Sequence, residues 1–518
     1  MGAVERKAGM TECPHEVLTA AGLDAARPEA VERQHRRGKL TARERIERLC
    51  DAGSFREIGA LARPEGSPEL AADGLVAGLG TVDGRPVVVL ATDFTVAGGS
   101  NGDLGNAKQD RCWRMAASRG IPVVMLLDGG GHRVSEGLDA RKFGGGFPLQ
   151  QTQARLSGWV PMVAAVLGPA YGQPTLAASL CDYVVAVRGQ AALGMAPPAL
   201  AASATGEQFD AEASCGADAQ AQHGLVDAAV DSETEALDAL RWYLAMLPSN
   251  AQAPLPVESV TDPQSDAAAA LDEAVPANLR QPYDMHAVIA GIVDADSDVE
   301  LKAEYAPNLI TTLARVGGRP LGIVASQPLQ KAGMLDAAAA AKAARLVSLC
   351  DAFGIPVLVL MDLPGLAVGA EAERSGLANA CARLITALGD ATVPTMTVIA
   401  RKGYGGGYVV LSGGRTFDPE LVVAWPDART AVMGPESAVE LMYRREIDAA
   451  PDPAARRAEL TGRFAEQAGV LGAAAAFGVD VVLRPSETRA WLLATLATLP
   501  RRRQLQTLTP RVRAVSPL

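Results

Sequence analysis

Hydrophobic and polar positions along the chain predict strands that alternate with helices. Glu29–Leu49 has the spacing of a basic amphipathic helix, and short β-rich runs follow at Leu75–Leu79 and Val87–Thr92. Leu104–Ser118 has the composition of a helix and precedes the continuously apolar run Pro122–Leu127. Because strands that are apolar throughout lie in sheets covered on both faces, the pattern predicts an α/β fold.

The same pattern occurs twice. Arg119–Gly129 is repeated as Phe353–Leu363, which lies 234 positions later (353 − 119). Tyr171 and the glycine after it are repeated at Tyr404, 233 positions later (404 − 171). A repeat of this length does not fit a solenoid, and 518 residues exceed what one hydrophobic core usually supports. The sequence therefore predicts two homologous domains in tandem.

A polar stretch between the repeats, Pro248–Pro263, is rich in Pro, Ser, Asn and Gln and predicts a linker. The second repeat begins near Tyr283, and a last helix is expected at Thr488–Leu499. The predicted organisation is an N-terminal tail at 1–28, an N-terminal domain at 29–255, a linker at 256–282 and a C-terminal domain at 283–518.

Composition and charge restrict the possible functions. The net charge of −11 argues against a nucleic-acid partner, and the N-terminus lacks the apolar segment of a signal peptide. Ser157–Cys181 carries no charge and is long enough to cross a bilayer, but its prolines and glycines favour a buried strand and helix of a soluble domain. The run Arg501–Arg503 is predicted to be a solvated turn.

The seven cysteines form no C-x-x-C pair and none lies near a histidine at ligand spacing, so no metal site is expected. An odd count in largely apolar surroundings favours buried, reduced thiols in a cytoplasmic protein.

Each repeat has a glycine-rich turn where a strand gives way to an expected helix, and in the second repeat the turn is Arg401–Tyr408. Glycine lets the backbone approach a ligand closely, and the first amides of a helix are unpaired. Two such amides can hold the oxyanion of an enolate or a tetrahedral intermediate. A single turn of this kind is equally compatible with packing alone, but its recurrence favours a function.

Nucleophilic chemistry is poorly supported. Ser412 and Ser437 have no histidine nearby in the sequence and no G-x-S-x-G elbow, and the glycine runs lack Walker or Rossmann spacing. His132 is the one histidine with a suggestive setting, because it follows Asp128 and three glycines at a predicted strand end. It is a candidate for a side chain that faces a site.

Six blocks of the chain together form a specific signature, within roughly residues 30–500. They are Gln34–Ile46, Asp93–Ser100, Met361–Gly365, Arg401–Tyr408, Ala424–Pro426 and Ala431–Gly434. With these blocks the chain resembles the carboxyltransferase (beta) subunit of biotin-dependent acyl-CoA carboxylases, of the propionyl-CoA and acetyl-CoA carboxylase type.

The resemblance implies two tandem crotonase (ClpP-like) β-β-α superhelix domains. It also implies that acyl-CoA binds mostly to the first domain and biotin to the second domain of another subunit. The site would then lie at a dimer interface within a homo-oligomer, commonly a hexamer, which docks a biotin carboxylase and biotin carrier partner. No Met-Lys-Met biotin-attachment motif occurs in the chain, so biotin is expected to arrive on another protein.

The resemblance also implies roles for individual residues. The amides of Gly172 and Gln173 would stabilise the acyl-CoA enolate, and those of Gly406 and Gly407 the ureido oxyanion left when carboxybiotin releases CO2. Biotin itself would take the α-proton, so no side-chain base is needed. The substrate-binding residues implied are Gly130, Gly131, His132, Tyr171 and Val409, and the biotin-binding residues are Gly365, Tyr404 and Gly405.

Three positions depart from the family pattern. The usual Asp-Ser-Gly-Gly-Ala-Arg run ends here in Gly131-His132-Arg133, and the first turn has Gln173-Pro174 in place of Gly-Ala. Proline has no N–H, so position 174 can donate nothing. Val409 stands where many members carry Asp, which suggests a pocket for a larger or less usual acyl group.

The hypothesis from the sequence is carboxyl transfer to an atypical acyl thioester. A decarboxylase that acts on a malonyl-type thioester at the same site is the nearest alternative. A non-catalytic subunit that keeps the fold for assembly is the second alternative, and Gln173-Pro174 is the feature that supports it.

Overall fold

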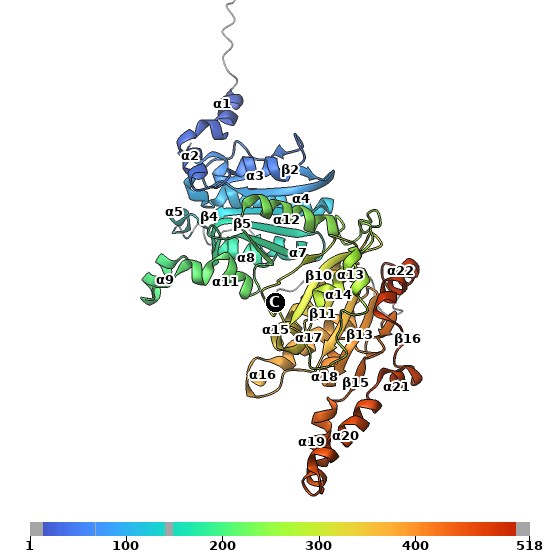
Figure 1. The fold of residues 1–518 in the computed structure, drawn as a ribbon. Helices are drawn as coiled ribbons and strands as arrows, with labels where there is room; N and C mark the ends of the chain where they lie inside the picture. Colours follow the sequence, from blue (N-terminus) through green and yellow to red (C-terminus); the bar gives the residue numbers. More distant parts are fainter. Residues whose placement is uncertain (1–13, 68, 139, 141–148, 504–518) are drawn as a thin grey trace, which may run out of the picture. The chain divides into compact units, whose positions relative to one another are not determined.

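The chain forms two compact units in a computed structural model (Figure 1). The first unit ends at Arg241, and the second begins at Trp242 and also takes in Ser157–Pro161 and Gln220–Ala228. The domain limits predicted from the sequence stay predictions, although residues 256–282 belong to the second unit. The structure describes residues 14–67, 69–138, 140 and 149–503.

An eight-stranded sheet forms the centre of the first unit, in the order β1-β2-β3-β4-β5-β6-β8, with β7 paired to β5. The strands from β1 to β3 are antiparallel, and the pairs β3–β4, β4–β5, β5–β6 and β5–β7 are parallel. The strands are β1 (Arg56–Glu57), β2 (Leu75–Val82), β3 (Arg85–Thr92), β4 (Val123–Gly129), β5 (Met162–Tyr171), β6 (Tyr183–Val187), β7 (Ala192–Gly194) and β8 (Ala228–Val230).

The second sheet repeats this topology strand for strand, in the order β16-β14-β13-β12-β11-β10-β9, with β15 paired to β13. Its antiparallel and parallel pairs fall at the equivalent places. The prediction of two tandem α/β repeats is therefore confirmed. The strands are β9 (Val299–Glu300), β10 (Leu309–Val316), β11 (Arg319–Ser326), β12 (Val357–Leu363), β13 (Thr395–Tyr404), β14 (Leu421–Ala424), β15 (Arg429–Ala431) and β16 (Val481–Val482).

Helices cover the sheets. In the N-terminal part they are α1 (Pro14–Ala20), α2 (Pro28–Arg36), α3 (Ala42–Leu49), α4 (Asp103–Arg119), α5 (Val134–Gly137), α7 (Leu149–Leu156), α8 (Gln173–Ser179), α9 (Pro198–Thr205), α10 (Ala211–Cys215), α11 (Ala217–Gln222) and α12 (Glu233–Met246). Farther along are α13 (Ser265–Ala270), α14 (Met285–Ile292), α15 (Ala337–Phe353), α16 (Ala370–Arg374), α17 (Leu377–Asp390), α18 (Gly405–Val410), α19 (Pro435–Asp448), α20 (Pro453–Gln467), α21 (Val470–Ala475) and α22 (Thr488–Thr498).

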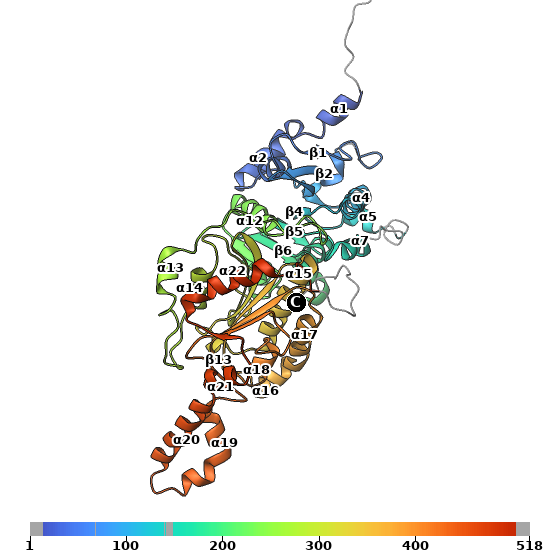
Figure 2. The same cartoon turned by 90° about the vertical axis from the view of Figure 1, so that its right-hand side faces the viewer.

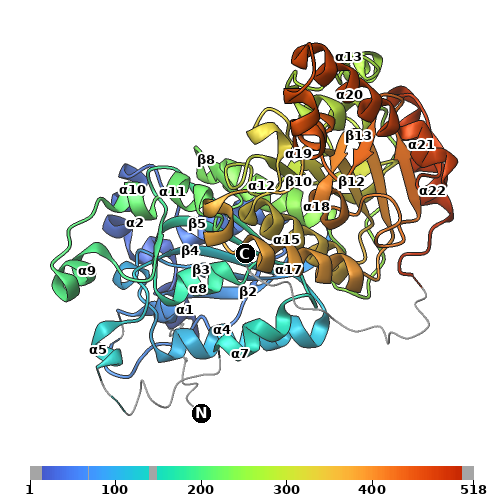
Figure 3. The same cartoon turned by 90° about the horizontal axis from the view of Figure 1, so that it is seen from below.

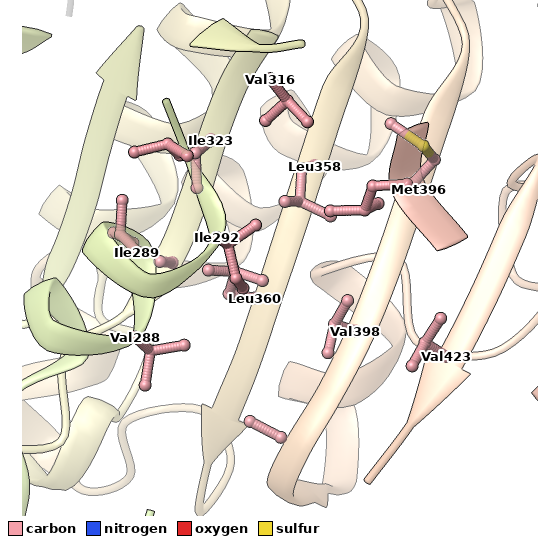
Figure 4. Close-up of a cluster of buried hydrophobic side chains, with 14 of the residues drawn as sticks. Val288, Ile289, Ile292, Val316, Ile323, Leu358, Leu360, Met396, Val398 and Val423 are labelled. Atoms are coloured by element: carbon pink, nitrogen blue, oxygen red, sulfur yellow. The ribbon is translucent and has the colours of Figure 1, made fainter. Parts of the chain in front are cut away.

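Helices α4 and α7 lie side by side against the first sheet, and α15 and α17 lie in the same way against the second (Figure 3). On the opposite face of the second sheet, Val288, Ile289 and Ile292 of α14 pack against Leu358 and Leu360 of β12 (Figure 4). Every residue of β12 is buried, as its continuous apolar run predicted. Helices α19 and α20 form a hairpin that stands away from the second sheet and has a small core of its own (Figure 2).

The single helix predicted at Glu29–Leu49 is wrong, because two helices occupy this stretch. Helix α2 ends at Arg36, and Gly38 then takes a left-handed φ of +72°. Helix α3 starts anew after Thr41, whose side chain forms a capping box with Glu44. A capped start after a left-handed glycine breaks the helix, although the apolar spacing continues across the break.

The run Arg501–Arg503 is not a solvated turn. Arg501 Nη2 donates to Phe353 O at 2.7 Å, and Arg502 Nη1 donates to Asp351 O at 2.7 Å. These acceptors are the last carbonyls of α15, which have no partner within the helix and attract cations. The arginines therefore cap a helix of the second unit.

Other expectations hold. Ser157–Cys181 contains β5 and α8, and the last helix lies at Thr488–Thr498. Among the helices that the structure describes, none combines the length and the apolar character needed to cross a membrane. In the described residues six cysteines are buried and form no disulfide, namely Cys50, Cys112, Cys181, Cys215, Cys350 and Cys381, and Cys13 lies outside the described residues.

Candidate active site

A buried aspartate ends the central strand of each repeat. Asp128 on β4 and Asp362 on β12 are equivalent (362 − 128 = 234) and have no solvent exposure. At each aspartate the pairing with the next strand shifts register. The shift frees the chain to form a loop at the carboxyl end of the parallel strands, where α/β sheets usually place ligands.

Asp128 is held by side chains from the N-terminal helical region. Lys39 Nζ lies 2.6 Å from Asp128 Oδ1, and Arg45 Nη2 lies 2.9 Å from Oδ2. Gln34 Nε2 also donates to Oδ2 at 2.9 Å. Burial lowers the pKa of Lys39, and the charge of Asp128 opposes this shift. Arg45 is fully buried and also binds Glu233, so the carboxylate belongs to a closed network of opposite charges.

The first glycine turn joins β5 to α8. Gly172 adopts φ +71° and ψ −119°, and its N–H donates to Gly194 O at 2.8 Å. The pairing of β5 with β7 thus already uses the Gly172 amide that was predicted as an oxyanion donor. Pro174 has no N–H. Of the two predicted donors at this turn, the Gln173 amide remains, since no backbone carbonyl of the described residues accepts a hydrogen bond from it.

The loop after β4 lies against this turn. Asn101 N donates to Gly131 O at 2.8 Å, and Arg133 N donates back to Asn101 O at 2.7 Å. Gly131 has a φ of +85°, and a Cβ at this position would lie 2.8 Å from Tyr171 O. The structure therefore brings the predicted substrate-binding residues of the first repeat together: Gly130, Gly131, His132 and Tyr171.

The second glycine turn, from β13 into α18, is equally crowded. A Cβ on Gly407 would lie 3.0 Å from the carbonyl carbon of Gly365, and a Cβ on Gly406 would lie 2.9 Å from Leu366 Cδ1. Gly405 has a φ of +63°, which favours glycine. A Cβ on Gly365 would lie 3.6 Å from Tyr404 O. The predicted biotin-side residues are thus neighbours.

The side chains of two further predicted site residues, Val409 and Tyr404, lie at this turn. Val409 follows Gly407 by two positions in α18 and is 46% exposed. Tyr404 is buried, and burial raises the pKa of its hydroxyl. No group of three His, Cys, Asp or Glu side chains in the described parts of the chain has the arrangement of a metal site.

Two buried lysines were missed by the sequence reasoning. Lys108 on α4 donates to Leu75 O, and Lys342 on α15 donates to Leu309 O at 2.8 Å. Both lysines and both acceptors are 234 positions apart (342 − 108 and 309 − 75). Burial lowers the pKa of each lysine to about 8. The repeat register was the signal that could have found them.

Comparison with known proteins gives the class. The chain matches the model of the carboxyl transferase domain over residues 33–514. It is 37% identical over 506 residues to the propionyl-CoA carboxylase carboxyltransferase subunit of Haloferax mediterranei, with 96% of each chain covered. It is also 36% identical over 482 residues to methylmalonyl-CoA decarboxylase subunit alpha of Veillonella parvula, with 92% of each chain covered.

A solved structure agrees. The hexamer-forming transcarboxylase 12S, with methylmalonyl-coenzyme A and methylmalonic acid bound, superimposes with a TM-score of 0.87 at 35% identity, covering 97% of this chain and 96% of that one. The chain therefore belongs to the carboxyl transferase family, and its two repeats are crotonase-fold carboxyltransferase domains. The resemblance inferred from the sequence is confirmed.

Proposed function

We propose that this chain is the carboxyltransferase subunit of a biotin-dependent acyl-CoA carboxylase, with the acyl thioester at the first glycine turn and biotin at the second. The observation that carries the proposal is the duplication of one device: a buried aspartate, a shift of register and a glycine turn in each repeat. Carboxyl transfer from biotin forms two oxyanions, on the enolate and on the ureido group of biotin, and one turn in each repeat could hold each of them.

The second turn suits the ureido ring of biotin. A Cβ at position 407 would lie only 2.3 Å from Leu363 Cδ1, and Gly405 has a left-handed φ of +63°, so this turn requires glycine. The amides of Gly406 and Gly407 begin α18 and can donate to an oxygen that carries negative charge. Gly365 and Tyr404 border this position. Biotin, carried on a partner protein, supplies the carboxyl group that is transferred.

At the first turn, the amide of Gln173 would hold the enolate oxygen of the acyl thioester. One preorganised donor of this kind typically contributes about 3 kcal/mol to the barrier. The loop Gly130–His132 borders the thioester. Val409 of a second subunit, on the biotin side that would face this turn, would add an apolar surface to the acyl pocket, which supports a substrate larger than propionyl or otherwise atypical.

The proposal includes a homo-oligomer built from dimers, as in the hexameric transcarboxylase 12S, with the acyl side of one subunit facing the biotin side of another. A biotin carboxylase and biotin carrier partner would charge the biotin. The buried free thiols support a reducing compartment such as the cytoplasm.

A malonyl-type thioester decarboxylase is the second candidate. It would form the same enolate at the first turn, and it would be favoured if the second turn does not bind biotin. The similarity to methylmalonyl-CoA decarboxylase subunit alpha also favours it.

The test is incubation of the purified protein with a panel of malonyl-type CoA thioesters, with and without free biotin, and mass spectrometry of the products. Biotin-dependent loss of the carboxyl group supports the proposal and identifies the acyl group. Equal loss without biotin supports the decarboxylase, and no loss from any thioester supports a non-catalytic subunit.

Two glycine variants locate the activity. Gly407→Val should abolish the biotin-dependent reaction, because its side chain would collide with Leu363 and Gly365. Gly462→Ala is the matched control, since its Cβ meets nothing within 4 Å, and it should retain activity.

A further inference from the structure

Arg133 connects three segments around the acyl-side loop. Its Nη2 lies 2.7 Å from Asp73 Oδ1 and donates to Ser100 O at 3.1 Å. Its Nη1 binds Glu136 Oε1. The Arg133 side chain is 11% exposed and Asp73 is fully buried, so this ionic cluster is well shielded from water.

The partners of Arg133 are themselves fixed. Asp73 Oδ2 accepts from Gly105 N at 2.7 Å, and Glu136 Oε2 accepts from Asp103 N at 3.0 Å. Both amides belong to the first turn of α4, where unpaired N–H groups favour carboxylates. Figure 2 shows the short helix α5, which carries Glu136, beside α4.

The turn that presents Asp73 is held in a strained conformation. Ala72 and Asp73 adopt φ values of +50° and +53°, which cost about 1–2 kcal/mol per residue for side chains other than glycine. Lys108 Nζ donates to Ala72 O at 3.0 Å and also to Leu75 O, on the other side of Asp73. Strain that persists under such restraint is typical of functional sites.

The second repeat keeps the backbone part of this arrangement without the charges. Leu335 N donates to Gly365 O at 3.1 Å and Ala367 N donates to Leu335 O at 2.9 Å, which matches the bonds around Asn101 in the first repeat. Ala367 stands at the position of Arg133 (367 − 133 = 234), and Pro307 at that of Asp73 (307 − 73 = 234). The ionic cluster is therefore an addition of the first repeat to a backbone arrangement that both repeats share.

We propose that Arg133 is a positioning residue for the acyl half-site. Held by Asp73 and Glu136, it fixes Gly131 against the carbonyl of Tyr171 and so controls binding of the acyl thioester. Binding of biotin at the other repeat is independent of it. Helix α5, which carries Glu136, also borders His132, since a Cβ on Gly137 of this helix would lie 2.9 Å from His132 Cδ2. This inference rests on the proposed function, which assigns the acyl thioester to this loop.

The test compares Arg133→Met, Arg133→Lys and Asp73→Asn with a matched control, Arg43→Met. Arg43 forms an ion pair with Glu57 at 2.8 Å in the same unit, and its side chain is similarly shielded, at 18% exposure. The readouts are KM for the thioester, KM for free biotin, kcat, the Kd of the thioester by calorimetry and the melting temperature.

Displacement of a binding loop by about 1 Å costs up to about a hundredfold, so Arg133→Met should raise KM and Kd for the thioester at least tenfold. KM for biotin should stay unchanged. Lysine keeps the charge but loses the planar fork of donors, so Arg133→Lys should give an intermediate value. Arg43→Met should change the melting temperature without changing either KM.

A thioester Kd that is unchanged in Arg133→Met, or raised equally in Arg43→Met, overturns the inference. If Arg133→Met does not fold, the isosteric Asp73→Asn gives the decision by the same readouts. If the proposed function is wrong, the wild-type protein will bind the thioester but show no biotin-dependent turnover. The comparison of thioester Kd values still tests the role of Arg133 in that case.

Discussion

Lys39 Nζ lies 2.6 Å from Asp128 Oδ1, in space that Gly168 leaves open. A Cβ at position 168 would lie 1.9 Å from Asp128 Oδ1 and 2.5 Å from Lys39 Nζ. In the second repeat the position equivalent to Gly168 is Arg401 (401 − 233), and its Nε donates directly to Asp362 at 2.9 Å. Each repeat therefore neutralises its buried aspartate, one with a cation from the adjacent strand and the other with a cation from a distant segment.

Lys39→Met should destabilise the protein. The substitution leaves Asp128 buried with Arg45 as its remaining cation, so we expect a loss near the lower end for a broken buried ion pair, about 3 kcal/mol. Denaturant unfolding of the variant and the wild type measures this. The double variant Lys39→Met with Asp128→Asn should recover part of the loss, and a Lys39→Met protein as stable as the wild type would contradict the network.

Gly168→Ala should be at least as damaging, because the added methyl group overlaps the ion pair. We expect a loss of about 3 kcal/mol or more in the free energy of unfolding, in the range of severe overpacking. Gly462→Ala on α20 is the control, and it should be neutral or slightly stabilising, since alanine favours a helix and meets no neighbour. Equal stability of the two variants would show that Gly168 is replaceable.

The sequence predicted what depends on local pattern and on the repeat. The apolar runs of β4 and β12 were identified because their residues recur in register, and so were the glycine turns that end β5 and β13. The partners of Asp128 could not be predicted, since Lys39 lies 89 positions away and has no equivalent in the other repeat. The occupied amide of Gly172 depends on the pairing of β5 with β7, which no periodicity shows.

His286 gives a pH dependence. Its Nε2 lies 2.9 Å from Glu300 and its Nδ1 lies 2.7 Å from Asp284, and the hydrogen bond to Glu300, followed by that to Asp284, raises the pKa of His286 to about 9. The folded protein therefore holds this proton more tightly than the unfolded chain, whose histidine titrates near about 6.5. The resulting stabilisation is complete below about pH 6.5 and is lost as the pH rises through about 9.

The stability difference between the wild type and His286→Gln should therefore be larger at pH 6 than at pH 10, and unfolding in denaturant at both pH values measures it. A His286→Gln difference that grows with pH would have the wrong sign for a protonated histidine.

Val409→Asp should change the choice of acyl group. The side chain is 46% exposed at the second glycine turn, where the proposed pocket needs an apolar surface for a bulky acyl chain. A carboxylate there would have to be desolvated by a longer chain, and one methylene in such a pocket typically changes kcat/KM about tenfold or more. We therefore expect the ratio of kcat/KM for longer over shorter acyl thioesters to fall at least tenfold.

Val260→Asp, at a site 65% exposed in the same unit, should leave this ratio unchanged. An unchanged ratio in Val409→Asp would remove Val409 from the acyl pocket, whereas the same fall in both variants would point to a general effect of the added charge.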